Sequence, residues 1–439
     1  MSEREWAERR VGWARLWARA KQVLTTDPTH SDEDDQVVDE EAARALAAAA
    51  GRLKGGLAKV AQLAAYTRAS SGARAVLGGL WDRAPAVSGG AIAEVVAQDL
   101  GRAPQALFAE WDATPIAAAS LGQVHAARLA DGAEVVVKVQ YPGVAEALRA
   151  DLDDPGFLRR LAGSEIGRSL DDATLTALAD AVRRELDYRL EADAQRRFGE
   201  AWQGDAVVRV PRVIGELSSA RVLTMERARG KTIVEVAAHG TPELRRDAAA
   251  AIYRFAWGSP LARGLVNADP NPGNFLIDQD AASRRDAARP GDGHVMVWCL
   301  DFGCALEVPA DVRDADLALW RALLDADGER AAERFRTALH AAGLLRRPDS
   351  LATHAHRDWE RALAAPLATH GDFHWDTAYA AELAASTGRA LAAGGLVLPA
   401  RVLLLWRQRL GAAAVLGLLD ASAPFRRLLA DLLQPPPYV

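Results

Sequence analysis

Two acidic segments in the second half of the chain limit most strongly what it can fold into. Asp269 is followed five residues later by Asn274, within the segment 267–277 (NADPNPGNFLI). Asp301-Phe302-Gly303 follows the apolar stretch 294–300, which predicts a strand that ends just before Asp301. An Asp and an Asn at this spacing place an acid or base and a metal-binding amide on one loop, and Asp301 adds a second metal ligand. Either segment alone is common in unrelated sequences. The two together, in this order, favour phosphoryl-transfer chemistry.

A lysine lies inside a predicted strand upstream of these segments. The segment 133–140 (AEVVVKVQ) alternates and is rich in β-branched residues, with Lys138 near its end. A lysine at a buried strand position is costly unless a carboxylate pairs with it, and an exposed edge position is the alternative. A run of small residues precedes this strand, where a phosphate-binding turn would lie. The run contains Ala117, Ala118, Ala119, Ser120, Gly122 and Gln123, and its alanines make it stiffer than a glycine-rich turn.

A predicted helix carries the candidate partners of Lys138. Leucines recur every three or four residues over 171–200, which predicts one long helix. Its candidate acids are Glu185, Asp187 and Glu191. At about 100° per residue, Glu185 and Glu191 lie about 240° apart around an undistorted helix, so only one of them can face Lys138. The spacing leaves open which acid does so.

Composition narrows the classes of function. The chain has 53 Lys and Arg against 59 Asp and Glu, a net charge of −6, so we expect no nucleic-acid partner. Aromatic residues make up only 6%, and alanine is abundant, which favours helices over a sheet-dominated fold. Cys299 and Cys304 are the only cysteines, so we expect a reducing compartment rather than a disulfide framework.

No signal peptide or membrane-spanning segment is expected from the apolar runs of the chain. Three tryptophans, Trp6, Trp13 and Trp17, recur at helical spacing among arginines near the N-terminus. Such a helix either packs on its own protein or lies on an anionic membrane surface. We therefore expect a cytoplasmic protein whose membrane contact, where there is any, is peripheral and on the inner face of the membrane.

The order of these features predicts the fold class. A small-residue turn, a strand lysine, an acidic helix, a strand that ends at Glu226 and two acidic loops follow one another along the chain. This order predicts an α+β, protein-kinase-like, two-lobed fold that is mostly helical. We expect an N-terminal helix and acidic linker over 1–41, a helical extension over 42–115, an N-lobe over 116–231 and a helical C-lobe over 232–439.

The sequence resembles the UbiB/AarF family, in its soluble-domain branch. These atypical kinase-like proteins are associated with coenzyme Q and other isoprenoid-lipid metabolism. The resemblance is carried by an Ala-rich loop, a strand lysine and a QYPGV stretch (117–144), an ExD-like motif (185–188), a hinge-like strand (223–226) and the two acidic loops. Segment 54–62 is similar to the KxGQ helix of the family, with Lys59 and Gln62 in register and Ala61 in place of the motif glycine.

This resemblance implies binding of ATP and Mg²⁺. Lys138 would contact the phosphates and Glu191 would orient it, while Asn274 and Asp301 would hold the metal and Asp269 would act as a base or metal ligand. The Ala-rich loop would cover the phosphates, and Glu226 would meet the adenine. The KxGQ extension would fold over the active site, where Lys59, Gln62, Glu185 and Asp187 would form a gating layer.

A site gated in this way favours slow ATP hydrolysis over phosphorylation of proteins in trans. The resemblance implies an isoprenoid lipid or enzymes of a quinone pathway as partners. Two alternatives remain open at this stage: a catalytically idle, lipid-binding scaffold with a kinase fold, and a small-molecule phosphotransferase. Retention of Asp269, Asn274 and Asp301 argues against the idle scaffold.

Overall fold

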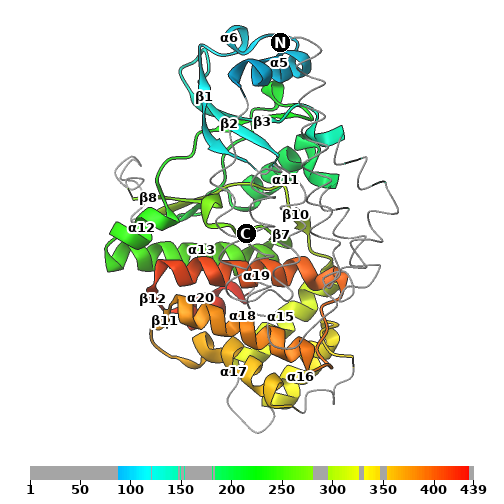
Figure 1. Ribbon diagram of the computed structural model, residues 1–439. Coiled ribbons are helices and arrows are strands. Elements are labelled where there is room, and N and C mark those ends of the chain that lie inside the picture. The colour runs from blue at the N-terminus through cyan, green and yellow to red at the C-terminus, as the bar shows by residue number, and fades with distance from the viewer. Residues whose placement is uncertain are drawn as a thin grey trace, which may run out of the picture. The chain divides into compact units, whose positions relative to one another are not determined.

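The computed structural model describes residues 88–434, except 120, most of 147–182, 280–294, 326–330 and 347–352 (Figure 1). The chain divides into two compact units. The first comprises Met1–Ala192 and Val213–Arg227, and the second comprises Asp193–Arg212 and Ala228–Val439. This division agrees with the predicted two-lobed fold. The Trp- and Arg-bearing N-terminal segment and the KxGQ-like segment, with Lys59 and Gln62, lie outside the described residues.

The first unit is built on a four-stranded antiparallel sheet of strand order β1-β2-β3-β5. The strands are β1 (Glu110–Ala118), β2 (Gly122–Arg128), β3 (Glu134–Gln140) and β5 (Val222–Glu226). Helix α5 (Gly89–Leu100) packs on this sheet through Ile92, Val95 and Val96, and the short helix α6 (Pro104–Leu107) follows it. The strand predicted over 133–140 is confirmed to within one residue as β3.

The long helix predicted over 171–200 is wrong in its middle. The chain is helical at 183–185, departs from helix at Leu186 and Asp187, and resumes as α11 (Tyr188–Ala201). The departure has a tertiary cause, because backbone groups at this point bond to the sheet segments of the first unit. The Tyr188 N–H donates to the Ala220 carbonyl at 2.9 Å, and Gln140 Nε2 donates to the Leu186 carbonyl at 3.2 Å.

The second unit contains short strands and most of the helices. Its main sheet has the order β4-β9-β8-β6, and two further strand pairs are β7–β10 and β11–β12. Strands β8 and β9 pair antiparallel. The strands are β4 (Val208–Arg209), β6 (Lys231–Thr232), β7 (Leu265–Asn267), β8 (Phe275–Asp278), β9 (Met296–Cys299), β10 (Ala305–Glu307), β11 (Phe373–Trp375) and β12 (Ala421–Ala423).

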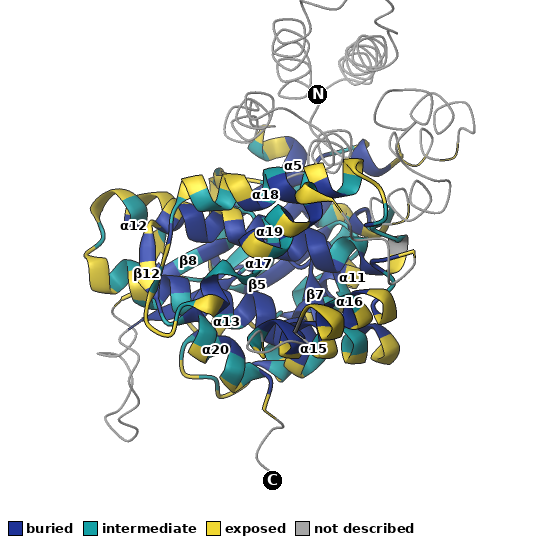
Figure 2. Cartoon of the chain, turned by 90° about the horizontal axis from the view of Figure 1, so that it is seen from below, coloured by how far each residue is buried: buried dark blue, intermediate teal, exposed yellow. Residues whose placement is uncertain are grey.

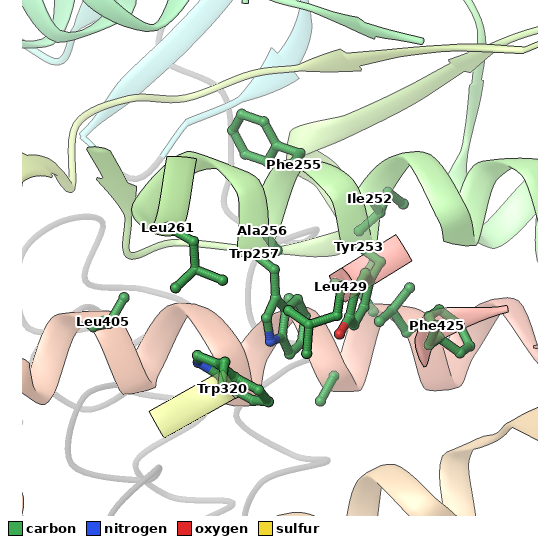
Figure 3. Close-up of a cluster of buried hydrophobic side chains, with 14 of the residues drawn as sticks. Ile252, Tyr253, Phe255, Ala256, Trp257, Leu261, Trp320, Leu405, Phe425 and Leu429 are labelled. Atoms are coloured by element: carbon green, nitrogen blue, oxygen red, sulfur yellow. The ribbon is translucent and has the colours of Figure 1, made fainter. Parts of the chain in front are cut away.

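The helices of the second unit surround α13 (Pro242–Arg263), whose apolar residues form the centre of the core. Figure 3 shows Tyr253 and Trp257 on the side of α13 that faces α19, and Phe255 on the opposite side. The other helices are α12 (Ile233–His239), α15 (Ala310–Leu324), α16 (Ala331–Ala341), α17 (His354–Ala368), α18 (Thr377–Ala392), α19 (Ala400–Leu419) and α20 (Phe425–Leu432). Figure 2 shows exposed residues on the outer turns of α12, in contrast to the buried inner helices.

Helix α19 is unusually apolar for a helix of this length. Within the described residues, its segment Arg401–Leu419 is long and apolar enough to cross a membrane, which the shorter apolar runs in the sequence did not predict. Most of this segment is buried inside the second unit, and it packs against α13, α18 and β7. This burial explains why the segment is so apolar, because it is a core helix of the second unit.

Candidate active site

The first unit contains a buried ion pair that involves Lys138. Lys138 Nζ lies 2.7 Å from Glu191 Oε1 and 2.9 Å from Glu191 Oε2. The two residues are only 6% and 4% exposed, and the ammonium group also lies 5.1 Å from the centre of the Tyr188 ring. Strand β3 has β2 on one side and β5 on the other, so the alternative of an exposed edge lysine is wrong. Lys138 is therefore a buried cation that the Glu191 carboxylate holds at contact distance.

The two other acids near this pair have different surroundings. Glu185 is buried at the end of the helical turn that precedes the break. Asp187 Oδ1 accepts the Arg189 N–H at 3.1 Å, and its carboxylate also pairs with the Arg189 guanidinium. These side-chain hydrogen bonds from Arg189 hold the pKa of Asp187 below its usual range. Asp187 thus stabilises the start of α11 locally, while Glu191 is the acid that reaches Lys138.

The Ala-rich run forms the hairpin turn between β1 and β2. Ala117 and Ala118 pair with Val124 and Gln123, and the Ala119 N–H donates to the Gly122 carbonyl at 2.9 Å. A Cβ at Gly122 would lie 2.1 Å from the Val139 carbonyl oxygen, so only glycine fits there.

The predicted nucleotide contacts on this turn include Gln123 and Ser120. Gln123 is buried, and its Nε2 lies 3.0 Å from His125 Nε2. Ser120 lies outside the described residues.

Glu226 occupies the end of the hinge-like strand. It is the last residue of β5, is half-buried and pairs with Val135 of β3. The Arg227 N–H then donates to the Glu134 carbonyl at 3.1 Å, and the chain leaves the first unit after this residue. Leu223 and Met225 of the same strand pack with Tyr188 of α11. The hinge-like strand and the helix that carries Glu191 therefore share one small core.

The second unit carries the loop of Asp269 and Asn274. Asn274 Nδ2 donates to the Asp269 carbonyl at 2.8 Å, and the Asn271 N–H donates to the same oxygen at 2.8 Å. Asn271 also caps the short helix η3 (Pro272–Asn274) by accepting the Gly273 N–H. Because the amide nitrogen of Asn274 is used within the loop, its Oδ1 is the atom that it offers to a cation.

Asp301 lies on a neighbouring loop of the same unit, in an unusual backbone conformation. Its φ of 57° is in the left-handed region, which costs a residue other than glycine about 1–3 kcal/mol. The Asn267 side chain donates to the Asp301 carbonyl at 2.9 Å, and Asp301 Oδ1 accepts the Gly303 N–H at 3.1 Å. The Leu300 N–H donates to the Asn274 carbonyl at 2.8 Å. The loops of Asn274 and Asp301 are thus tied together through their backbones.

Two residues of α19 contact these loops, and sequence reasoning gave neither a role there. Arg407 Nη2 lies 3.2 Å from Asp269 Oδ1, and Gln408 Oε1 accepts the Asn267 N–H at 2.8 Å. No local pattern indicates the contact between Arg407 and Asp269, because 138 residues separate the two along the chain.

The oxygen donors of the second unit suit magnesium. Among the described residues, no group of three or more His, Cys, Asp or Glu side chains could hold a metal by itself. The Asp301 carboxylate and the Asn274 amide are hard oxygen donors on two connected loops. Magnesium is typically bound by one or two carboxylates together with substrate phosphates, so this donor set fits a metal that arrives with a nucleotide.

Comparison with known proteins identifies the family. The model of the ABC1 atypical kinase-like domain matches residues 79–335. The chain is 31% identical to the mitochondrial atypical kinase COQ8B of Rattus norvegicus over 241 residues, which cover 55% of this chain and 43% of that protein. It is 32% identical to the uncharacterized protein Rv0647c of Mycobacterium tuberculosis over 300 residues, covering 66% of this chain and 57% of the relative. The chain thus spans about half the length of these curated relatives.

A solved structure is similar to most of the chain. The complex of Rv3197 with erythromycin, from Mycobacterium tuberculosis, is 27% identical in sequence and superposes with a TM-score of 0.63, covering 91% of this chain and 98% of that one. The matched family model contains every described element from α5 to α15 and both acidic loops. The chain therefore belongs to the ABC1 atypical kinase-like family, as its resemblance to UbiB/AarF proteins predicted.

Proposed function

We propose that this protein binds ATP with Mg²⁺ and acts as an atypical kinase or ATPase of the UbiB type. The observation that carries the proposal is the buried Lys138–Glu191 pair, with 2.7 Å between Nζ and Oε1. A fold gains little stability from burying such a pair, because desolvation offsets most of the attraction. Its presence in a kinase-like family favours a role in binding phosphates.

Each site residue then has a role. ATP with its magnesium ion supplies a γ-phosphoryl group that can pass to water or to an acceptor hydroxyl. In the first unit, the Lys138 ammonium contacts the phosphates, Glu191 holds that ammonium in place, and the hairpin turn 117–123 covers the phosphates. In the second unit, Asn274 and Asp301 bind the metal, and Asp269 accepts a proton from the attacking oxygen. Glu226, at the end of β5, meets the adenine.

The proposal extends to the setting in which the activity is used. The rat relative is named a mitochondrial atypical kinase. We place the present protein in the cytoplasm, with its activity in support of isoprenoid-lipid or quinone metabolism and with peripheral contact with the inner face of the membrane. Residues Lys59, Gln62, Glu185 and Asp187 would form the gating layer that keeps peptide substrates out. An isoprenoid lipid or an enzyme of a quinone pathway is the partner that we propose.

A thermal-shift experiment tests nucleotide binding. A ligand at about 100 times its Kd should stabilise the wild type by about 2.7 kcal/mol. We expect ATP to raise the Tm of the wild type only with Mg²⁺, and we expect Lys138→Ala and Asp301→Asn to abolish the shift. Lys231→Ala is the matched control, because Lys231 is an exposed lysine on β6. A shift of wild-type size in both site variants would refute the proposal.

The same preparation separates the proposal from its two alternatives. Release of phosphate from ATP without a small alcohol supports the ATPase, whereas transfer of the γ-phosphate to a small alcohol supports a phosphotransferase. An idle scaffold would release no phosphate, and an anionic lipid vesicle would shift its Tm without nucleotide. Stimulation of phosphate release by such vesicles would favour the proposed role in lipid metabolism.

Macrolide binding is a second candidate function. The solved structure that covers 91% of this chain is a complex with erythromycin. An erythromycin arm in the thermal-shift experiment tests this candidate. A dose-dependent rise in Tm that persists in Asp301→Asn would support macrolide binding that is independent of the nucleotide site.

A further inference from the structure

Arg407 on α19 links the two acidic loops of the second unit. It is 6% exposed, its Nη2 lies 3.2 Å from Asp269 Oδ1, and its Nη1 lies 3.9 Å from Cys304 Sγ. Cys304 directly follows Asp301-Phe302-Gly303 in the chain. One planar guanidinium therefore contacts both the carboxylate of Asp269 and the loop that carries Asp301. The contact from Nη2 to Oδ1 restrains where the Asp269 carboxylate lies relative to α19.

Gln408, the next residue, makes a second connection to the same loops. It is 1% exposed, its Oε1 accepts the Asn267 N–H at 2.8 Å, and its Nε2 donates to the Ala256 carbonyl of α13 at 2.6 Å. Asn267 in turn donates from Nδ2 to the Asp301 carbonyl at 2.9 Å. The strained backbone of Asp301 is thus connected through Asn267 and Gln408 to the core helix α13.

Gly411 brings the backbone of α19 close to the same loop. A Cβ at this position would lie 2.5 Å from Cγ and 3.2 Å from Cδ of Pro270, the residue after Asp269. The absence of a side chain at Gly411 therefore lets α19 approach the loop closely enough for Arg407 to reach Asp269.

Other charged residues of α19 serve stability and provide a contrast. Arg409 forms a buried ion pair with Asp316 of α15, with 2.7 Å between Nη1 and Oδ1. Arg401 forms an exposed ion pair with Asp311 of α15 at 2.6 Å. Neither pair includes a residue of the two acidic loops. Helix α19 thus makes one set of contacts with the acidic loops and another set of ion pairs with α15, and substitutions can test the two sets separately.

We propose that Arg407 and Gln408 are positioning residues for phosphoryl transfer. Arg407 orients the Asp269 carboxylate, and Gln408 holds the Asp301 loop in its metal-binding conformation through Asn267. The inference rests on the proposed function, because its effect is measured on ATP turnover. It adds α19, which lies beyond the matched family model, to the parts of the chain that act on the reaction.

Steady-state ATP hydrolysis by the full chain tests both residues. We expect Arg407→Met to lower kcat by about 10- to 100-fold, as for other groups that orient an active-site residue, with little change in the KM for ATP. Arg407→Lys, which keeps the positive charge, should recover part of this loss. Gln408→Met should act differently and raise the Mg²⁺ concentration needed for half-maximal rate, because it releases the Asp301 loop.

Three further variants separate positioning from folding. Arg401→Met should leave kcat and Tm unchanged, and Arg409→Met should lower Tm without lowering kcat at temperatures where the protein stays folded. Gly411→Ala retains Arg407 but displaces Pro270, so it should lower kcat even if Arg407→Met fails to fold. If the wild type neither binds nor hydrolyses ATP with Mg²⁺, the proposed function and this inference fail together. If the wild type hydrolyses ATP and Gly411→Ala and both folded Arg407 variants keep its kcat, only the inference fails.

Discussion

At the scale of single residues, burial of Lys138 determines how strongly the loss of its ion pair with Glu191 affects stability. Its side chain is 8% exposed and that of Glu191 is 4% exposed, so little water is left to solvate either charge. Breaking a buried pair by removing one partner leaves an uncompensated charge, whereas an exposed pair contributes little. Helix α11 carries one pair of each kind, because Asp193 and Arg196 form an exposed ion pair on the same helix.

We expect Glu191→Gln to lower the free energy of unfolding by about 3–5 kcal/mol, because it removes the negative charge that contacts the buried Lys138 ammonium. Urea denaturation of the wild type and the variant measures this difference. Asp193→Asn is the control on the same helix and should change stability by less than about 1 kcal/mol. Equal effects of the two substitutions would show that the buried pair contributes no more than the exposed one.

Geometry along the sequence predicted part of this arrangement. The 240° separation of Glu185 and Glu191 on a regular helix predicted that only one of them faces Lys138, and in the structure Glu191 contacts it. The choice itself could not be read from the spacing, because the chain departs from helix between the two acids. The positions of the two acids relative to each other depend on the hydrogen bonds that join Tyr188 to Ala220 and Leu186 to Gln140. Ala220 and Gln140 belong to other parts of the first unit.

At the scale of elements, periodicity predicted β3 and β9 well, because most apolar residues of both strands are buried. It failed at Leu186 and Asp187, where the Leu186 carbonyl and the Tyr188 N–H bond to Gln140 and Ala220, two residues outside the helix. It also gave no indication that α19 contacts the Asp269 loop. A buried Arg in an apolar helix shows only that it needs a partner, and the sequence cannot say which carboxylate that is.

The Asp99 carboxylate attaches helix α5 to the residues that immediately precede strand β5. Asp99 accepts hydrogen bonds from the Ser219 hydroxyl, at 2.7 Å, and from Arg221 Nε, at 2.9 Å. Burial by itself would raise the pKa of Asp99, but the hydrogen bonds from Arg221 and Ser219 outweigh it and hold the pKa below the ordinary value of 3.8. The unfolded chain therefore binds a proton more readily at this group than the folded protein does.

This shift predicts the pH dependence of the Asp99 contribution. The stabilisation should be fully present well above pH 3.8 and should be lost as the pH falls through the lower pKa of the folded state. At pH 7, we expect Asp99→Asn to lower the free energy of unfolding by about 1.5–3 kcal/mol, the range for hydrogen bonds to charged groups. The difference should shrink as denaturation is repeated towards pH 3. Glu94→Gln, an exposed carboxylate on the same helix, is the control, and a difference that stays constant with pH would contradict the assignment.

At the scale of the whole molecule, the chain has a separate apolar core in each unit. One core joins α5 to the sheet of the first unit, and the other surrounds α13 in the second unit. The order of motifs along the sequence predicted two lobes because each motif belongs to a local strand–turn or strand–loop unit. The entry of residues 193–212 into the second unit was not predicted, since it depends on pairing between β4 and β9, which are far apart in the sequence.

Because each unit has its own core, we expect a substitution that destabilises one unit to leave the stability of the other unit unchanged. Gly122→Ala places a Cβ 2.1 Å from the Val139 carbonyl oxygen in the first unit, and overpacking of this kind costs about 1–3 kcal/mol. Local opening is governed by the stability of each cooperative part. We expect hydrogen–deuterium exchange, followed by mass spectrometry of peptides, to become faster in β1, β2, β3 and β5 and to stay unchanged in α13 and α19. Gly90→Ala on α5, where an added Cβ has no neighbour within 4 Å, should leave both units unchanged. Faster exchange of α13 and α19 to the same extent as the sheet would mean that the two units unfold as one.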